Sequence, residues 1–213
     1  MPTITDGPLE IIIAGPTGFA NNIYILVDTA TRECAFVDAP DVEKCAEAAD
    51  AAGLRPSKIL LTHGHPDHIA GIEGLKAKYG CEVVSGRGDS WLNQGLIDTA
   101  IEHGGTVKVG GITLDVIHNP GHTPASTTYL WGKHAFVGDT LFPGGPGRTQ
   151  KNADLLQEIE SIQTRLYTLA DDTTVWTGHG DKTTIAASKV EHADFASRPH
   201  DPNLHGDVAW ATS

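Results

Sequence analysis

Short apolar runs, bounded by glycine, proline or polar turn residues, recur along most of the chain. A run of this kind is typical of a buried β-strand. The runs predict strands at residues 9–14, 23–27, 34–37, 58–62, 82–85, 107–109, 112–117, 127–131, 135–137 and 175–177. Apolar positions at helical spacing, together with capping signals, predict helices at residues 41–52, 71–79, 89–102, 153–169 and 184–195. The order of these elements predicts a mixed α/β protein of two β-rich halves.

One strand end is unusually rich in candidate metal ligands. Residues 62–68 read Thr-His-Gly-His-Pro-Asp-His and follow an apolar run directly. In an extended segment, residues two apart point the same way, so His63 and His65 can bind one ion. The intervening proline favours a sharp turn, beyond which Asp67 and His68 can face a different point. Imidazole and carboxylate ligands suit zinc, iron or manganese. The segment therefore predicts two adjacent metal sites.

This motif resembles the signature of the metallo-β-lactamase superfamily, and later stretches resemble that superfamily's downstream motifs. The stretches are Asn-Pro-Gly-His-Thr-Pro-Ala-Ser at 119–126, Phe-Val-Gly-Asp-Thr-Leu-Phe at 136–142 and Thr-Gly-His-Gly at 177–180. The Gly-Asp-Thr-Leu-Phe motif is most similar to that of glyoxalase II, the hydroxyacylglutathione hydrolases. The resemblance covers residues 62–180 and implies a four-layer αβ/βα sandwich, the metallo-β-lactamase fold.

The same resemblance implies a binuclear metal site. It assigns His63, His65 and His122 to one metal, Asp67, His68 and His179 to the other, and Asp139 to both as a bridge. Two divalent ions are therefore expected, with zinc favoured and iron or manganese also suitable. In such enzymes a hydroxide that bridges the metals attacks the carbonyl carbon of a thioester such as S-lactoylglutathione. Asp67, which can orient the hydroxide, and Asp139 are the expected catalytic residues.

The substrate is predicted less specifically than the metal ligands. Arg148 lies after the Asp139 loop, where glyoxalase II enzymes carry a basic residue that contacts glutathione. Arg148 is therefore predicted to bind a substrate carboxylate. Thr149 and Gln150 stand where those enzymes have aromatic residues. A different acyl-thiol or ester substrate is therefore an alternative to a glutathione thioester.

Two other activities on the same fold are also compatible with parts of the motif set. Persulfide dioxygenases share much of the pattern and use one iron, whose ligands would here be His63, His122 and Asp139. The intact second ligand set favours the hydrolase over that sulfur oxygenase. Lactonases of this fold usually carry a tyrosine near the bridging aspartate, whereas Asp139 is followed here by Thr140 and Leu141.

Composition and charge limit the partners and the cellular location that are compatible with the sequence. The 213 residues carry 27 acidic and 15 basic side chains, a formal net charge of −12, which argues against nucleic acid as a partner. The three cysteines form no disulfide framework, and the N-terminus has no basic segment followed by an apolar run. No apolar stretch approaches the roughly 18–20 residues of a membrane span. We predict one domain over residues 1–213, located in the cytoplasm and acting on a small molecule.

Overall fold

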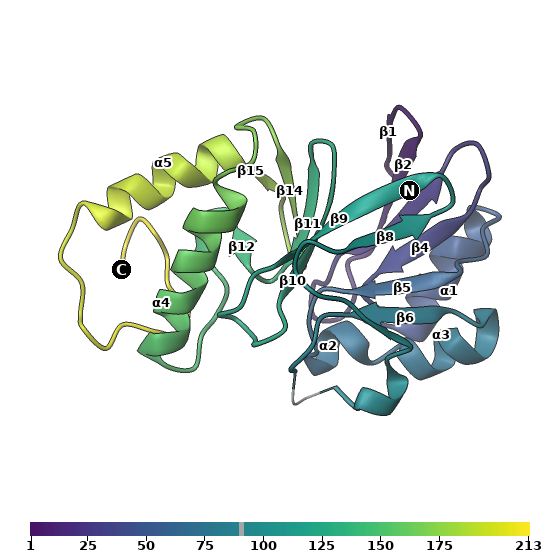
Figure 1. The fold of residues 1–213 in the computed structure, drawn as a ribbon, viewed down its shortest axis with the longest axis horizontal. Helices are drawn as coiled ribbons and strands as arrows, with labels where there is room; N and C mark the ends of the chain where they lie inside the picture. The colour runs from purple at the N-terminus through teal and green to yellow at the C-terminus, as the bar shows by residue number, and fades with distance from the viewer. Residues whose placement is uncertain (90–91) are drawn as a thin grey trace.

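Two β-sheets face each other at the centre of the molecule (Figure 1). The computed structural model describes residues 1–89 and 92–213. The first sheet contains, in spatial order, β1 (Thr3–Asp6), β2 (Leu9–Ala14), β3 (Ile23–Asp28), β4 (Cys34–Val37), β5 (Lys58–Leu61), β6 (Glu82–Ser85) and β7 (Thr99–Ala100). The second contains β15 (Thr183–Thr184), β14 (Thr174–Thr177), β11 (His134–Gly138), β10 (Thr127–Trp131), β9 (Ile112–His118) and β8 (Thr106–Val109). A separate short hairpin joins β12 (Leu141–Phe142) to β13 (Gly145–Pro146).

Helices cover the outer face of each sheet (Figure 1). The first sheet carries α1 (Val42–Ala51) and α3 (Ile72–Tyr79), and the short α2 (Pro66–Ile69) follows β5. The second sheet is covered by α5 (Ile185–Ala196) and by α4 (Asn152–Ser161), which continues as a π-helical turn, Ile162–Leu166. This arrangement is the predicted four-layer αβ/βα sandwich, so the predicted fold class is confirmed. None of the helices within the described residues is both long and apolar enough to cross a membrane.

The central strands are buried on both faces, which explains their nearly continuous apolar sequences. In β3, Ile25 packs beneath α1 and α3, whereas Tyr24 and Leu26 point into the core between the two sheets. In β9 the pattern alternates instead, with Leu114 in the inter-sheet core and Asp115 exposed. Leu60 of β5 and Phe136 of β11 share this inter-sheet core, and both strands lead directly into the predicted ligand loops.

The predicted ligands all follow carboxyl ends of strands. β11 and β14 are parallel neighbours, so the loops after Gly138 and Thr177 leave the second sheet at the same edge. β9 runs in the same direction, because β10 is antiparallel to both β9 and β11. In the first sheet β4 and β5 are also parallel. Ligands of open α/β sheets commonly bind outside carboxyl ends of strands, where loop side chains converge.

The helix predicted at residues 89–102 is wrong. The described part of that segment contains a short 3₁₀ helix, Gln94–Leu96, followed by β7, and Trp91 lies outside the described residues. Asp89 explains the difference. Its carboxylate accepts hydrogen bonds from the backbone N–H of Gly64 at 2.5 Å and of Ala125 at 3.0 Å. These long-range contacts hold the segment against two ligand loops and outweigh its local helix propensity.

The C-terminal segment, residues 197–213, packs against the rest of the second half of the molecule. The indole of Trp210 is buried against Phe195, with ring centroids 4.8 Å apart. The backbone N–H of Trp210 donates to the carbonyl oxygen of Gly144 at 2.7 Å. The segment therefore packs beside the loop that follows Asp139.

Candidate metal centre

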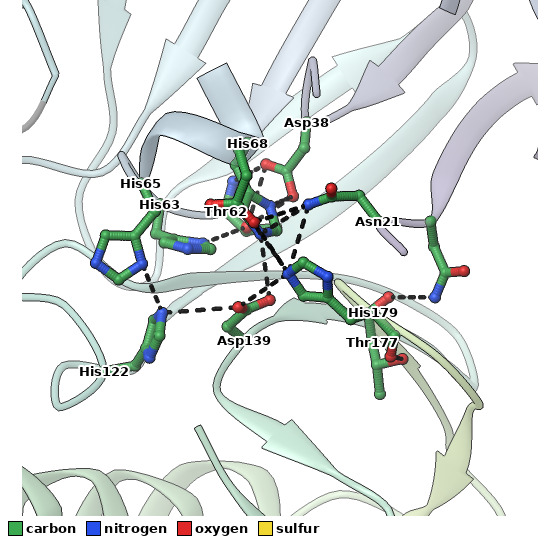
Figure 2. A network of polar contacts seen from close by, with 12 residues as sticks. Asn21, Asp38, Thr62, His63, His65, His68, His122, Asp139, Thr177 and His179 are labelled. Carbon is green, nitrogen blue, oxygen red and sulfur yellow. Dashed lines mark hydrogen bonds and ion pairs between the residues drawn. The ribbon is translucent and has the colours of Figure 1, made fainter. Parts of the chain in front are cut away.

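All of the predicted metal ligands converge where the ligand loops of the two sheets meet. Figure 2 labels each of them except Asp67. Three groups of them have nitrogen or oxygen atoms within 4.8 Å of one another and could each hold a metal ion. The groups are His63, His65 and His122; His63, His68 and Asp139; and Asp67, His68 and His179. The first and third groups have the same members as the two ligand sets proposed from the sequence.

The first group consists of three neutral imidazoles. The ring of His63 lies 4.8 Å, centroid to centroid, from the rings of both His65 and His122. His65 Nδ1 is 2.9 Å from His122 Nε2. Burial lowers the pKa of all three rings and keeps them in the uncharged form that binds metal. The Nε2 atom of His63 is buried and forms no hydrogen bond with any described residue. A buried ring nitrogen left in this way is readily explained by a metal bond.

The second group lies in a strongly negative environment. Within it, the Nε2 atom of His179 is 3.1 Å from His68 Nε2 and 3.2 Å from the Oδ2 atom of Asp67. Burial of the ring works against protonation of His179, but the carboxylates of Asp139 and Asp67 outweigh it and raise its pKa to about 10. A field that retains a proton in this way also favours a metal cation in the proton's place.

The carboxylate of Asp139 lies between the two groups. Its Oδ1 atom is 3.3 Å from the Nε2 atom of His68. Its Oδ2 atom is 3.3 Å from His179 Nε2 and 3.8 Å from His122 Nε2. Burial alone would raise the pKa of Asp139, but neighbouring His68 and His179 hold it well below its usual range. Asp139 therefore presents a negative charge to imidazoles of both groups.

In three of the candidate ligands, the outer ring nitrogen is held by a fixed acceptor. His122 Nδ1 donates to the carbonyl oxygen of Arg148 at 2.9 Å, and His179 Nδ1 donates to that of Phe19 at 2.9 Å. His68 Nδ1 donates to the carboxylate of Asp38 at 2.8 Å. Since the proton is on Nδ1, the Nε2 atom of His122 and of His179 is left facing the centre. Imidazoles oriented in this way, together with the carboxylates, fit a divalent zinc, iron or manganese ion.

Asp38 is not among the site residues predicted from the sequence. Asp38 follows β4 with a positive φ of 62° and is buried. Besides His68, its carboxylate accepts a hydrogen bond from the backbone N–H of Thr62 at 2.8 Å. The available signal was a polar residue at the end of a buried strand next to the one that carries His63. Asn21 was missed as well, and its side-chain amide donates to the carboxylate of Asp67 at 3.1 Å.

Replacing Asp38 by asparagine is expected to weaken zinc binding about 10–100-fold, a usual effect of changing a group that orients a metal ligand. Asparagine tolerates a positive φ, so the turn should persist. Its amide keeps one acceptor for Thr62 but leaves a donor, not an acceptor, facing His68 Nδ1. Competition with a chelator measures the affinity. A folded variant with unchanged zinc affinity would show that Asp38 does not orient His68.

A pocket of about 380 Å³ opens beside the centre. Its walls include the candidate ligands His122, Asp139 and His179, and also Arg148 and Asp207. The Nη1 atom of Arg148 is 2.8 Å from the Oδ2 atom of Asp207, and both side chains are exposed. The structure thus brings the predicted substrate-binding residue to the pocket, where its guanidinium already has a partner from the C-terminal segment.

Residues 17–179 match the family model described as Metallo-beta-lactamase superfamily. The chain belongs to the metallo-β-lactamase superfamily. It is 35% identical to a hydroxyacylglutathione hydrolase of Bradyrhizobium sp. (strain ORS 278), over 73% of this chain and 61% of that protein's length. It is 31% identical to the hydroxyacylglutathione hydrolase GloC of Haemophilus influenzae, over 85% of this chain and 95% of that protein.

A solved structure supports the same placement. The crystal structure of TTHA1623 in a di-iron-bound form superposes with a TM-score of 0.73 at 28% sequence identity. The match covers 84% of this chain and 97% of that chain. The resemblance to the superfamily that was inferred from the motifs is therefore confirmed.

Proposed function

We propose that the protein is a binuclear metal-dependent hydrolase of thioesters, with a hydroxyacylglutathione such as S-lactoylglutathione as substrate. The position of Asp139 carries this proposal, because its two oxygen atoms face imidazoles of both ligand groups. The similarity to hydroxyacylglutathione hydrolases supports the choice of substrate. The chain spans 61% of the length of the first of those relatives. The proposed substrate therefore depends on the chemistry of the site as well as on this similarity.

We assign the ligands to two ions. His63, His65 and His122 would hold the first ion, Asp67, His68 and His179 the second, and Asp139 would contact both. When bound, divalent ions at such a site supply Lewis acidity and lower the pKa of water towards about 7. Zinc suits this set of imidazoles and carboxylates, with iron or manganese as alternatives, and the related di-iron-bound structure supports two ions.

Residues of the chain orient the reactants. Asp67 can accept a hydrogen bond from the attacking water, since its carboxylate is fixed by the amide of Asn21. In the reaction, the oxygen of water forms a bond to the thioester carbonyl carbon and the carbon–sulfur bond breaks. The products are a carboxylate, a thiol and a proton. His122 and His179 line the pocket, so a thioester bound there would have its carbonyl group next to the centre.

The guanidinium of Arg148 gives the pocket wall a group that suits a charged substrate. We assign Arg148 to a substrate carboxylate, which would compete with Asp207 for the guanidinium. Exposed ion pairs of this kind are typically worth less than about 1 kcal/mol, so the exchange costs little. The free, buried cysteines Cys34, Cys45 and Cys81 are compatible with a reducing cytoplasm, where glutathione thioesters form.

Elemental analysis of purified protein, combined with an S-lactoylglutathione hydrolysis assay, tests this function. We expect about two metal ions per chain and thiol release that stops when metal is removed by a chelator and returns with zinc. One iron per chain, no hydrolysis and oxygen uptake with a persulfide would instead identify a sulfur oxygenase. Hydrolysis of a lactone but of no thioester would also contradict the proposed substrate.

A further inference from the structure

A buried carboxylic acid lies just outside the metal centre and belongs to neither ligand group. Glu158 is on α4 and has 0% of its surface exposed. Its Oε2 atom is buried without a hydrogen-bond partner among the described residues. Burial raises the pKa of Glu158 well above its usual range. A leucine would fill this space at lower cost, so the carboxyl group calls for a specific explanation.

One contact links Glu158 to the acceptor that orients His122. Its Oε1 atom accepts a hydrogen bond from the backbone N–H of Gly147 at 3.1 Å. The next residue is Arg148, whose carbonyl oxygen accepts the Nδ1 proton of His122 at 2.9 Å. Gly147 is closely surrounded, because a Cβ atom there would lie 1.9 Å from the carbonyl oxygen of Asp139 and 2.9 Å from His122 Nδ1. The Glu158 carboxyl group therefore holds a peptide that touches two of the assigned ligands.

The same part of α4 also packs against the loop that carries His122. A Cβ atom on Gly121 would lie 2.2 Å from Cβ and 2.4 Å from Cα of Glu158. Three residues further along, the hydroxyl of Ser161 donates to the carbonyl oxygen of Pro120 at 2.7 Å. Backbone packing thus places the His122 loop on α4, while the Glu158 side chain holds the loop that contains Gly147 and Arg148.

We propose that Glu158 is a positioning residue for the metal centre. Its carboxyl group holds the backbone N–H of Gly147 and thereby fixes the Arg148 carbonyl that orients the imidazole of His122. This inference rests on the proposed role of His122 as a metal ligand. The relevant group is an acceptor oxygen rather than a charge, so glutamine should replace glutamate and an apolar side chain should not.

The test compares Glu158→Leu, Glu158→Gln and the exposed control Glu160→Leu on the same helix. Each full-length variant is stripped of metal, and its zinc dissociation constant is measured by chelator competition. For Glu158→Leu we expect zinc affinity to fall about 10–100-fold. Its kcat for S-lactoylglutathione should fall as well, with KM within about twofold of wild type. Glu158→Gln and Glu160→Leu should retain wild-type affinity.

Three results would overturn the inference. The first is unchanged zinc affinity in a folded Glu158→Leu protein. The second is a loss of affinity in Glu158→Gln equal to that in Glu158→Leu, and the third is a wild-type protein without zinc affinity. If the leucine variant does not fold, Glu158→Met takes its place, since its flexible side chain adapts to irregular space. If wild-type protein binds zinc but hydrolyses no thioester, the proposed function fails while the affinities still decide the role of Glu158.

Discussion

Replacement of Asp139 by alanine is expected to remove bound metal and to reduce kcat/KM for thioester hydrolysis by about 1000-fold or more. The carboxylate faces His68, His122 and His179 within 3.8 Å, and no other described carboxylate is placed between both ligand groups. Without it, each of the two proposed ions would lose a negative ligand, and no shared ligand would hold the pair together. Elemental analysis and initial rates measure the two effects on the same preparation.

Two companion variants make the result specific. Asp139→Asn preserves the volume of the side chain and should also lose metal, because an amide is a far weaker ligand than a carboxylate. Asp115→Ala removes an exposed carboxylate from β9 and should behave as wild type. An Asp139→Ala protein with two metals and full turnover would show that the bridging assignment is wrong.

Local patterns were sufficient to predict a mixed α/β protein and most of its strands and helices, whereas the four layers and the full ligand set were implied by the family resemblance. Strands such as β2, β4 and β6 lie at the predicted residues, because each contains a short apolar run bounded by polar or turn residues. The seven ligand candidates were found because they occur in compact motifs after strands. The structure brings these side chains together, while their roles as metal ligands stay proposals.

The residues that the sequence did not reveal act through contacts distant along the chain. Asp38 contacts a histidine 30 positions away, and Glu158 contacts a peptide 11 positions away. Asp89 binds loops 25 and 36 positions away, and for that reason a segment with helical spacing is mostly irregular. The local sequence around a single acidic residue in a turn or on a helix is the same whether or not the residue has such a distant partner.

Gly178→Ala is expected to disrupt the centre almost as strongly as loss of the bridging carboxylate. A Cβ atom at Gly178 would lie 2.1 Å from Asp139 Oδ1 and 2.8 Å from Cε1 of His68, so the carboxylate must move by about 1 Å or more. A displacement of about 1 Å at a reacting centre can cost about 100-fold in rate. We therefore expect kcat/KM to fall at least about 100-fold, together with loss of metal, as measured by initial rates and elemental analysis.

The matched control for this substitution is Gly18→Ala. A Cβ atom at Gly18 meets nothing within 4 Å, and neither Gly18 nor Gly178 has the positive φ that an alanine would find strained. The two variants therefore differ mainly in the contact that the new methyl group makes. Gly178→Ala could instead bind metal and turn over like Gly18→Ala. In that case the Asp139 carboxylate would not need to lie between the two ligand groups, and the bridging assignment would be wrong. If Gly178→Ala lost metal and Gly18→Ala did not, the result would show that activity depends on the position of the Asp139 carboxylate, independently of its charge.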